Sequence, residues 1–397
     1  MIARMREIAP RILIVFASLV IAVSLLEFPA LFKLVDYGRI IGNASGDIFL
    51  STNRGDPELL HIHPPHSHFS GSFQGGNITT GFRIPTADMT TYQWDVRYDE
   101  HGFRNDVDLK AADIVVIGDS FVESLTTPTP ELTTSRLAEL QHKVVANLGQ
   151  YGYGPLEELA VLRRFGLPLH PRTVIWMFFE GNDLNDVLRY RKASVRGRTP
   201  QRFWSSFWER SFTINALAQI RKQYRQLSRP FGKKRSGTIG EPNAQQRTIY
   251  FVYSAPPLSS EQLDAFNQTL DTIATAHQLC ANHASRLIFV FIPAKFRVFR
   301  DLCKFPEASE CRKWSLNDLP NRMSKAIRAV SADIRYLDLT RDFIGSVRRG
   351  ELPYYADDDH WSPEGHKVAA EAIKAYLPSD SKQSPPHMIA SRSELRQ

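Results

Sequence analysis

The chain has 397 residues, of which 43% are hydrophobic, and its formal net charge is +7. A chain of this length and composition can bury a large core in one domain or two. Its contents of glycine and proline are near average, which excludes collagen-like and wholly disordered classes. The positive charge is concentrated in residues 191–235, which hold 13 Lys or Arg against one acid, Glu209. The rest of the chain is therefore mildly acidic, and we expect no general nucleic-acid-binding surface.

A basic and then apolar segment opens the chain. Arg4, Arg6 and Arg11 precede an apolar run, ILIVFASLVIAVSLL, that resumes as FPALF after Glu27. The run alone is shorter than the roughly 20 residues of a typical spanning helix. Because no A-x-A-like cleavage site follows, we expect residues 1–36 to form an uncleaved signal anchor rather than a cleaved signal peptide. The positive-inside rule then predicts a single-pass cell-membrane protein whose remaining domains are extracytoplasmic.

Residues 37–110 are expected to form an irregular, polar, extracytoplasmic extension. It contains the stretch HIHPPHSH, with His61, His63, His66 and His68. Four imidazoles suggest a metal site, but two prolines and the absence of a nearby acid favour an extended loop. We therefore expect no metal site and no cofactor.

The chain has three cysteines. Cys303 and Cys311 lie close together in the turn-rich stretch CKFPEASEC, where a small disulfide loop is consistent with an oxidising compartment. Cys280 would then be unpaired. The spacing also allows three separate thiols, and three cysteines do not make a metal site.

Apolar runs typical of buried strands alternate with helical periodicity over residues 111–378. The strands are expected at 113–118, 143–149, 173–180, 286–293 and 333–340, and the helices at 131–141, 155–166, 259–284, 321–330 and 362–377. Such continuous apolar strands indicate a parallel sheet covered on both faces. The sequence therefore predicts an α/β protein, with a three-layer α/β/α domain and a central parallel sheet.

Polar loops follow the carboxyl ends of these strands, where such folds place function. The first strand ends in Gly118-Asp119-Ser120, the second in NLGQYGYGP and the third in Gly181-Asn182-Asp183, and YYADDDHWSPEGH precedes the last helix. These loops can meet at one edge of the sheet, although they are far apart in the chain.

The residue types in these loops suit acyl transfer. A serine such as Ser120 needs a base to remove its proton, and the base needs an acid to fix its tautomer. His360 is the best-placed base, and a tight turn brings Asp357, three residues earlier, back to it. Oxyanion donors are available from the backbone N–H of Ser120, the glycine-rich second loop and the Asn182 amide.

Competing interpretations exist for several of these residues. Ser120 also suits a plain turn at a strand end, and Asn182 suits the N-cap of a helix over 183–190. Asp358 and Asp359 compete with Asp357 as the orienting acid. His366 falls inside the last expected helix, facing away from the sheet edge, which disfavours it as the base.

Four sequence blocks, in order, resemble the SGNH hydrolases, also called the GDSL esterase/lipase superfamily. The first is GDSF, with Phe121 in place of the eponymous leucine; the others carry Asn147 and Gly152, Asn182 in GND, and Asp357 with His360 in Asp-x-x-His. The resemblance implies a Ser120–His360–Asp357 triad and an oxyanion hole formed by Ser120, Gly152 and Asn182. It also selects Asp357 among the three adjacent acids, and implies an enzyme that needs no cofactor.

A basic insertion over about 191–250 interrupts the hydrolase domain. Phe203, Trp204, Phe207, Trp208 and Phe212 recur in it with helical spacing. We expect a helical cap packed on the hydrolase domain, with its basic face in solvent. A membrane-interface helix and a surface for acidic polysaccharides are the alternatives. Residues 379–397 are expected to be disordered.

Three functions remain compatible with these motifs. The first is a membrane-anchored serine esterase acting on an acylated small molecule, glycan or lipid outside the cytoplasm. The second is an O-acyltransferase that uses the same triad to modify a polysaccharide. The third is a non-catalytic glycan-binding protein, which the complete set of site residues disfavours.

Overall fold

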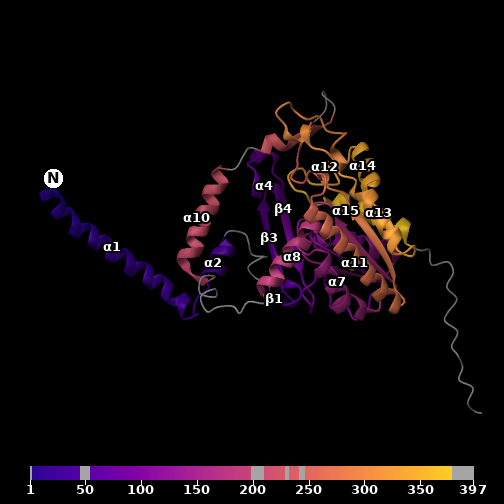
Figure 1. Cartoon of the computed structure of the whole chain (residues 1–397), viewed down its shortest axis with the longest axis horizontal. Helices are drawn as coiled ribbons and strands as arrows, with labels where there is room; N and C mark the ends of the chain where they lie inside the picture. Colours follow the sequence, from indigo (N-terminus) through magenta and orange to yellow (C-terminus); the bar gives the residue numbers. More distant parts are fainter. Residues whose placement is uncertain (1, 45–53, 198–209, 229–231, 241–245, 378–397) are drawn as a thin grey trace, which may run out of the picture.

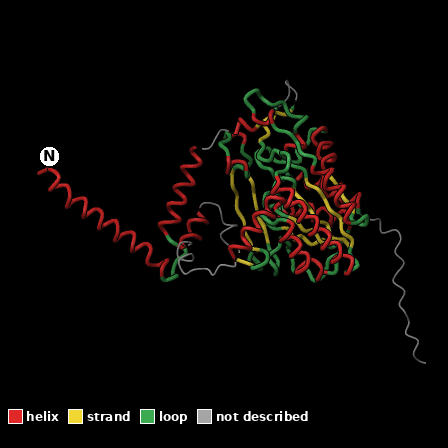
Figure 2. Tube along the Cα trace, viewed as in Figure 1, coloured by secondary structure: helices red, strands yellow, loops and turns green. Residues whose placement is uncertain are grey.

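The computed structural model describes residues 2–44, 54–197, 210–228, 232–240 and 246–377. Its centre is a five-stranded parallel sheet with strand order β11-β10-β7-β5-β6. The strands are β5 (Ile114–Gly118), β6 (Val145–Gly149), β7 (Thr173–Phe179), β10 (Arg286–Ile292) and β11 (Arg335–Asp338). Figure 2 shows helices flanking these strands. The predicted α/β class with a central parallel sheet is confirmed.

Alternating side chains of the strands supply two separate cores. Val115 and Ile117 of β5 belong to one buried cluster, while Ile114 and Val116 belong to the other. The first cluster includes residues of α7 (Pro155–Val161), α8 (Asp183–Gly197), α11 (Ser260–Asn282) and α13 (Leu319–Val330). The second includes residues of α5 (Ser120–Glu123), α6 (Thr133–Gln141), α12 (Lys295–Phe299), α14 (Thr340–Arg348) and α15 (Pro363–Tyr376). Burial on both faces explains why the strand sequences are continuously apolar.

The strand order places a topological switch point beside β5. β5 is the first strand of the sheet in sequence, yet it lies between β6 and β7. From β5 the chain passes to β6 on one side, and from β6 it crosses back to β7 on the other side of β5. In open α/β sheets such a point opens a crevice at the carboxyl ends of the strands. Ser120 follows β5 and Asn182 follows β7, so both lie at the carboxyl ends of strands beside this point.

The amino-terminal extension is more regular than the sequence suggested. It contains β1 (Arg54–Asp56) paired with β2 (Leu60–Ile62), β3 (His68–Gln74) paired with β4 (Thr91–Arg97), and the short α4 (Ile78–Gly81). Both pairs are antiparallel. The irregular loop expected for this region is therefore corrected, and its weak alternation explains the error: β3 is almost wholly exposed.

The four histidines of the extension bind different protein groups. His61 Nε2 lies 2.9 Å from the Tyr151 carbonyl oxygen, His63 is buried against Glu123, and His68 pairs with Asp95. His66 lies 3.7 Å from Asp108. Across the described ranges, no group of three or more potential metal-ligating side chains is present.

The N-terminal helix α1 (Ile2–Leu31) projects away from the body of the molecule (Figure 1). Its segment Leu13–Leu31 has a hydropathy of 2.3 and is only 6% buried, so it is long and apolar enough to cross a membrane. It is followed by α2 (Tyr37–Ala44).

In the part of the basic insertion that the structure describes, the helix does not form the expected cap on the hydrolase domain. This helix, α10 (Phe212–Ser228), contacts α2 and α1 instead, and Figure 1 shows it standing beside α2. The insertion ends in an antiparallel pair, β8 (Ser236–Ile239) and β9 (Arg247–Tyr250), which joins the domain core through Ile249. The aromatic residues at 203–208 and the tail at 379–397 lie outside the described residues.

The three cysteines are free thiols in the structure. Cys280 and Cys311 are buried, and Cys303 is half-buried. Burial raises the pKa of the Cys303 thiol to about 12 and that of Cys311 to about 11. The disulfide considered from the spacing is thus not formed here.

The contact between the extension and the acid-rich loop gives a first testable prediction. A methyl group added to Gly76 would lie 2.5 Å from Asp358 Cβ and 2.6 Å from the Asp357 carbonyl oxygen. We expect Gly76→Ala to lower the free energy of unfolding by about 1–3 kcal/mol, as overpacking typically does, and to lower the melting temperature in thermal unfolding.

Gly81→Ala is the matched control, because nothing lies within 4 Å of its added methyl group. We expect this variant to retain or slightly raise the melting temperature. Equal melting temperatures for both variants would contradict the described packing of the extension.

Candidate active site

Ser120 begins the short helix α5, directly after the buried strand β5. The Asp119 side chain caps this helix by accepting a hydrogen bond from the Phe121 N–H at 2.9 Å. Burial raises the pKa of Asp119 to about 6, although hydrogen bonds and the nearby His360 favour its ionised form. Ser120 itself is half-buried between fully buried neighbours, so its hydroxyl group sits at a fixed place with solvent access.

His360 lies between Ser120 and a carboxylate. Its Nε2 is 2.9 Å from Ser120 Oγ, and its Nδ1 is 2.5 Å from Asp358 Oδ1. A carboxylate only accepts hydrogen bonds, so Nδ1 carries the proton and Nε2 presents its lone pair to the hydroxyl group. This is the arrangement in which an imidazole can remove the proton of a serine.

The carboxylate hydrogen-bonded to His360 is that of Asp358, so the expected pairing of His360 with Asp357 is corrected. The Asp357 carboxylate points to the extension, where it accepts hydrogen bonds from the Gly76 N–H, the Thr90 N–H and hydroxyl group, and the Tyr92 hydroxyl group, at 2.7–3.1 Å. Four donors occupy it, so it is not available to the imidazole. Asp358 accepts instead from the Asn77 N–H at 2.7 Å and from His360.

Electrostatics couple His360 and Asp358. Burial of the imidazole favours its neutral form, but the Asp358 carboxylate, together with Asp119 and Asp359, outweighs burial and raises the pKa of His360 above its ordinary value. Burial likewise opposes the charge of Asp358, but His360 and the N–H donors outweigh it and lower the pKa of Asp358. Asp358 therefore remains charged at neutral pH and favours the protonated form of His360.

A buried lysine, Lys295, organises the backbone of the acid-rich loop. Its Nζ donates hydrogen bonds to the carbonyl oxygens of Tyr355, Ala356 and Asp358 at 2.6, 2.9 and 3.0 Å. Burial lowers the pKa of Lys295 to about 8. The lysine begins α12 just after β10, and sequence reasoning missed it. The only available signal was a lone charge after a fully apolar strand, since lysine is rarely buried without partners.

The expected oxyanion residues flank Ser120 on the neighbouring loops. Gly152 follows β6 with φ +75°, a conformation that favours glycine, and its carbonyl accepts a hydrogen bond from Arg189. Asn182 follows β7 and donates its amide N–H to Asp186 at 2.7 Å. Asn147 lies within β6, where its amide binds the Val122 carbonyl at 2.8 Å and so ties α5 to this strand. The structure thus brings Gly152 and Asn182 to the same sheet edge as Ser120.

Glu123, one turn after Ser120, connects the two loops of the site. Its carboxylate accepts hydrogen bonds from His63 Nε2 at 2.8 Å, from the Tyr98 hydroxyl group at 2.6 Å and from the Tyr151 N–H at 2.5 Å. Burial opposes its charge, but His63 and the other donors outweigh burial and lower its pKa. Because Tyr151 precedes Gly152, a carboxylate on the helix that begins at Ser120 holds the loop that carries Gly152. Sequence reasoning missed this residue as well.

His366 has no part in the arrangement around Ser120. It is buried within α15, where its Nε2 lies 2.9 Å from Ser124 Oγ and its Nδ1 lies 2.9 Å from Thr133 Oγ1. Burial lowers the pKa of His366 to about 3, so it stays neutral. Its position in the last helix is the one expected from the sequence.

Several buried carboxyl groups lie behind the loops after β5 and β7. Burial raises the pKa of Asp186 to about 7 and that of Glu157 to about 8, and it raises the pKa values of Asp183 and Glu158 well above their ordinary values. Asp183 accepts from the Phe179 N–H at 2.8 Å, and Glu158 from the Trp176 indole at 2.6 Å. Groups that hold their protons near neutral pH add little negative charge to a site where an oxyanion must form.

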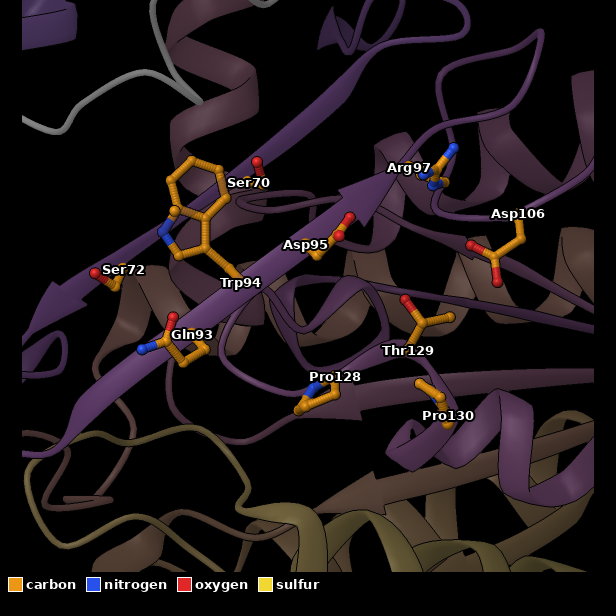
Figure 3. A pocket seen from close by; sticks show the side chains of 11 residues that line it. Ser70, Ser72, Gln93, Trp94, Asp95, Arg97, Asp106, Pro128, Thr129 and Pro130 are labelled. Carbon is orange, nitrogen blue, oxygen red and sulfur yellow. The ribbon is translucent and has the colours of Figure 1, made fainter.

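A cavity of about 680 Å³ lies beside the β3–β4 hairpin (Figure 3). It is lined by Ser70, Gly71, Ser72, Gln93, Trp94, Asp95, Arg97, Asp106, Pro128, Thr129 and Pro130. None of these residues belongs to the Ser120–His360–Asp358 arrangement, so this cavity is separate from the candidate catalytic groups.

Comparison with known proteins finds similarity to SGNH hydrolase-like domains. Residues 254–395, which include Asp358 and His360, match the family described as "SGNH hydrolase-like domain, acetyltransferase AlgX". No curated protein sequence matches the chain. The matching solved structures include a lipolytic protein of the G-D-S-L family from Desulfitobacterium hafniense DCB-2. It is 15% identical over 66% of this chain and 98% of its own, with a TM-score of 0.35. An acetyl xylan esterase is 12% identical over 67% of this chain and 100% of its own, also with a TM-score of 0.35.

The assignment of the acid predicts different outcomes for two adjacent substitutions. Asp358→Asn removes the carboxylate that orients His360, and we expect kcat for a small activated ester to fall by about 10⁴-fold, as in other triads. In the pH profile of any residual activity, the fall on the acidic side should occur at a lower pH than in the wild type. The reason is that the raised pKa of His360 depends on the Asp358 carboxylate. In the wild type, the midpoint of this fall should lie above pH 6.5. The pH dependence of kcat/KM measures both.

Asp357→Asn serves as the matched control, since it is equally buried and one residue away. It should lower the melting temperature through its bonds to the extension and leave kcat far less affected. A larger loss of kcat in Asp357→Asn than in Asp358→Asn would contradict the assignment.

The position of Glu123 gives a third prediction. Glu123→Gln keeps the size of the side chain but replaces one acceptor oxygen with a donor, against three groups that all donate. We expect a loss of about 1–3 kcal/mol in stability, and a lower kcat with little change in KM because the loop before Gly152 is displaced. Steady-state kinetics and thermal unfolding separate the two effects.

Glu139→Gln is the control, because Glu139 is exposed on α6. It should change neither quantity. Wild-type kcat in Glu123→Gln, with a lowered melting temperature, would restrict Glu123 to a purely structural role.

Proposed function

Starting from the SGNH hydrolase-like domain that the chain contains, we propose that the protein is a membrane-anchored serine esterase. It would remove acyl groups, such as acetyl, from an extracytoplasmic glycan or lipid. The single observation that carries this proposal is the hydrogen-bonded series from Ser120 Oγ through His360 to Asp358.

In the first half of the reaction, Ser120 Oγ attacks the ester carbonyl carbon while His360 Nε2 takes the hydroxyl proton. The carbonyl oxygen becomes an oxyanion, for which the N–H groups of Ser120 and Gly152 and the Asn182 amide are the proposed donors. Collapse of the tetrahedral intermediate breaks the ester C–O bond. The imidazolium returns its proton to the departing alcohol, and the acyl group remains on Ser120.

In the second half, water attacks the acyl-serine. His360 removes a proton from the water, and the acyl group leaves as the free acid when the serine oxygen is reprotonated. Asp358 keeps its charge throughout and favours the imidazolium at both stages. No cofactor is required by this sequence of steps.

The proposed location follows from α1. A helix with an apolar stretch at Leu13–Leu31 and arginines before it is compatible with a signal anchor. We propose that it remains attached and holds the catalytic domain outside the cytoplasm. Polymers and lipids of the cell envelope would then be within reach of Ser120.

An O-acyltransferase is the second candidate, favoured by the acetyltransferase description of the matching family. The first half of the reaction is unchanged. In the second half, a sugar hydroxyl group replaces water, so the acyl group passes from Ser120 to a polysaccharide. The two functions differ only in the acceptor.

Two measurements test the nucleophile and the acceptor. A serine-directed fluorophosphonate should label the full-length wild type and the exposed-serine control Ser72→Ala, and it should not label Ser120→Ala. Equal labelling of Ser120→Ala would reject Ser120 as the nucleophile.

With an acylated donor and a glycan acceptor, free acid as the product indicates an esterase, and acylated glycan indicates a transferase.

A further inference from the structure

We propose that α10 is a membrane-interface helix, which lies with its apolar side in the surface of the lipid bilayer that α1 crosses. This inference rests on the membrane anchor of the proposed function. It concerns the basic insertion, to which the catalytic mechanism gives no role.

The two helices are joined where α1 ends. Glu27 of α1 accepts hydrogen bonds from the Ser211 hydroxyl group at 2.9 Å, the Phe212 N–H at 3.2 Å and the Thr213 N–H at 2.7 Å. A helix start has unpaired N–H groups and a partial positive charge, so a carboxylate stabilises it. A second contact comes from Tyr37 of α2, whose ring packs edge-on against Phe212 at 5.3 Å. The start of α10 is therefore tied to the end of the anchor helix.

The position of Glu27 sets the depth at which α10 begins. Leu31, the last residue of the apolar segment, is four residues further on. At about 1.5 Å per residue, Glu27 lies about 6 Å before the end of that segment. Interfacial helices typically lie about 5–10 Å into the boundary between headgroups and acyl chains. With α1 inserted, the first turn of α10 is thus at the depth of this boundary.

α10 presents an apolar stripe that no part of the described chain covers. Leu217, Ile220 and Tyr224 are 57%, 62% and 71% exposed, and Ile214 is 43% exposed. At about 100° per residue these positions fall within about a third of the helix circumference. A stripe of large apolar side chains in water is unfavourable, at roughly 25 cal/mol per Å² of apolar surface.

The rest of the described structure rarely exposes such residues. Outside residues 2–44 and α10, the exposed large hydrophobic side chains are Phe73, Val107, Val144, Tyr151 and Tyr376, which lie far apart in the sequence. On α1 and the segment after it, exposure continues through Phe28, Phe32 and Leu34 up to the junction with α10. Exposed apolar side chains are therefore concentrated on the anchor helix and on the helix that is tied to it at Glu27.

The charge of α10 suits anionic lipid headgroups. Its sequence includes Arg221, Lys222 and Arg225 and no acidic residue, within a segment of 13 basic residues against one acid. Basic residues near a membrane surface contribute about 1 kcal/mol each with anionic lipids. Apolar anchors and basic residues on one helix favour a bilayer over an acidic polysaccharide, which would use the charges but leave the apolar stripe in water.

The test uses the full-length chain with single cysteines carrying the fluorophore NBD, in a Cys303→Ser background; the other two thiols are buried. The labelled sites are Leu217→Cys on α10, Val20→Cys on α1 and Val144→Cys, an exposed apolar control on the body. The proteins are reconstituted into phosphatidylcholine–phosphatidylglycerol vesicles with or without nitroxide-labelled lipid. Ester hydrolysis is followed in the same samples.

We expect the label at 217 to lose most of its emission to the nitroxide lipid and to resist aqueous iodide, as the label at 20 does. The label at 144 should show the opposite pattern. The inference is overturned, and the anchor retained, if iodide but not nitroxide lipid quenches the label at position 217 while nitroxide lipid quenches the label at position 20. Protection of 217 by soluble polygalacturonate alone also overturns it, in favour of an acidic polysaccharide.

The remaining outcomes separate the inference from the proposed function. Failure of lipid to quench at 20 rejects the anchor and, with it, the interfacial position of α10. Lipid quenching at 217 without ester hydrolysis by the parent protein rejects the esterase and retains the interfacial helix.

Discussion

The burial of two adjacent carboxylates, Asp357 and Asp358, is the constraint on which the rest of the site depends. An ionised carboxylate removed from water is costly unless hydrogen bonds and an opposite charge replace its hydration. Asp357 obtains four donors from residues 76–92, and Asp358 obtains the Asn77 N–H and the imidazole of His360. The extension therefore completes the environment of the acid that faces the base. It belongs to the site, although it lies before the hydrolase domain in the sequence.

The parallel sheet and the positions of Ser120 and His360 at one of its edges could be predicted because their signals are local. Strands such as β5 and β7 are buried on both faces, so their sequences are continuously apolar, and their ends are marked by Gly118 and Gly181. Ser120 and His360 are the polar residues that these boundaries bring to one edge. The carboxylate that faces His360 could not be identified in this way. Asp357, Asp358 and Asp359 are consecutive and chemically identical, and the sequence does not show which side chain points toward the imidazole. Donors more than 260 residues away in the sequence decide between them.

Glu123 and Lys295 illustrate a different limit. Each is a single charged residue that follows a strand, and neither belongs to a spacing pattern. Their roles depend on the partners that the fold brings to them, such as the Tyr151 N–H or the carbonyl oxygens of residues 355–358. The extension was mispredicted for a related reason, since its exposed strands lack the apolar alternation that marks a half-buried strand. In each instance the missing information was tertiary.

The bonds between Gly76 or Asn77 and the acid-rich loop also have a consequence for how the protein matures. They close a loop of 281 residues, so the site has a high contact order and is expected to form late in folding. Ser120 precedes His360 by 240 residues, and Asn77 precedes Asp358 by 281. Because a chain is synthesised from its amino end, both hydrogen bonds can form only after synthesis has passed residue 360. Under the proposed function, the protein would gain catalytic competence only after that point.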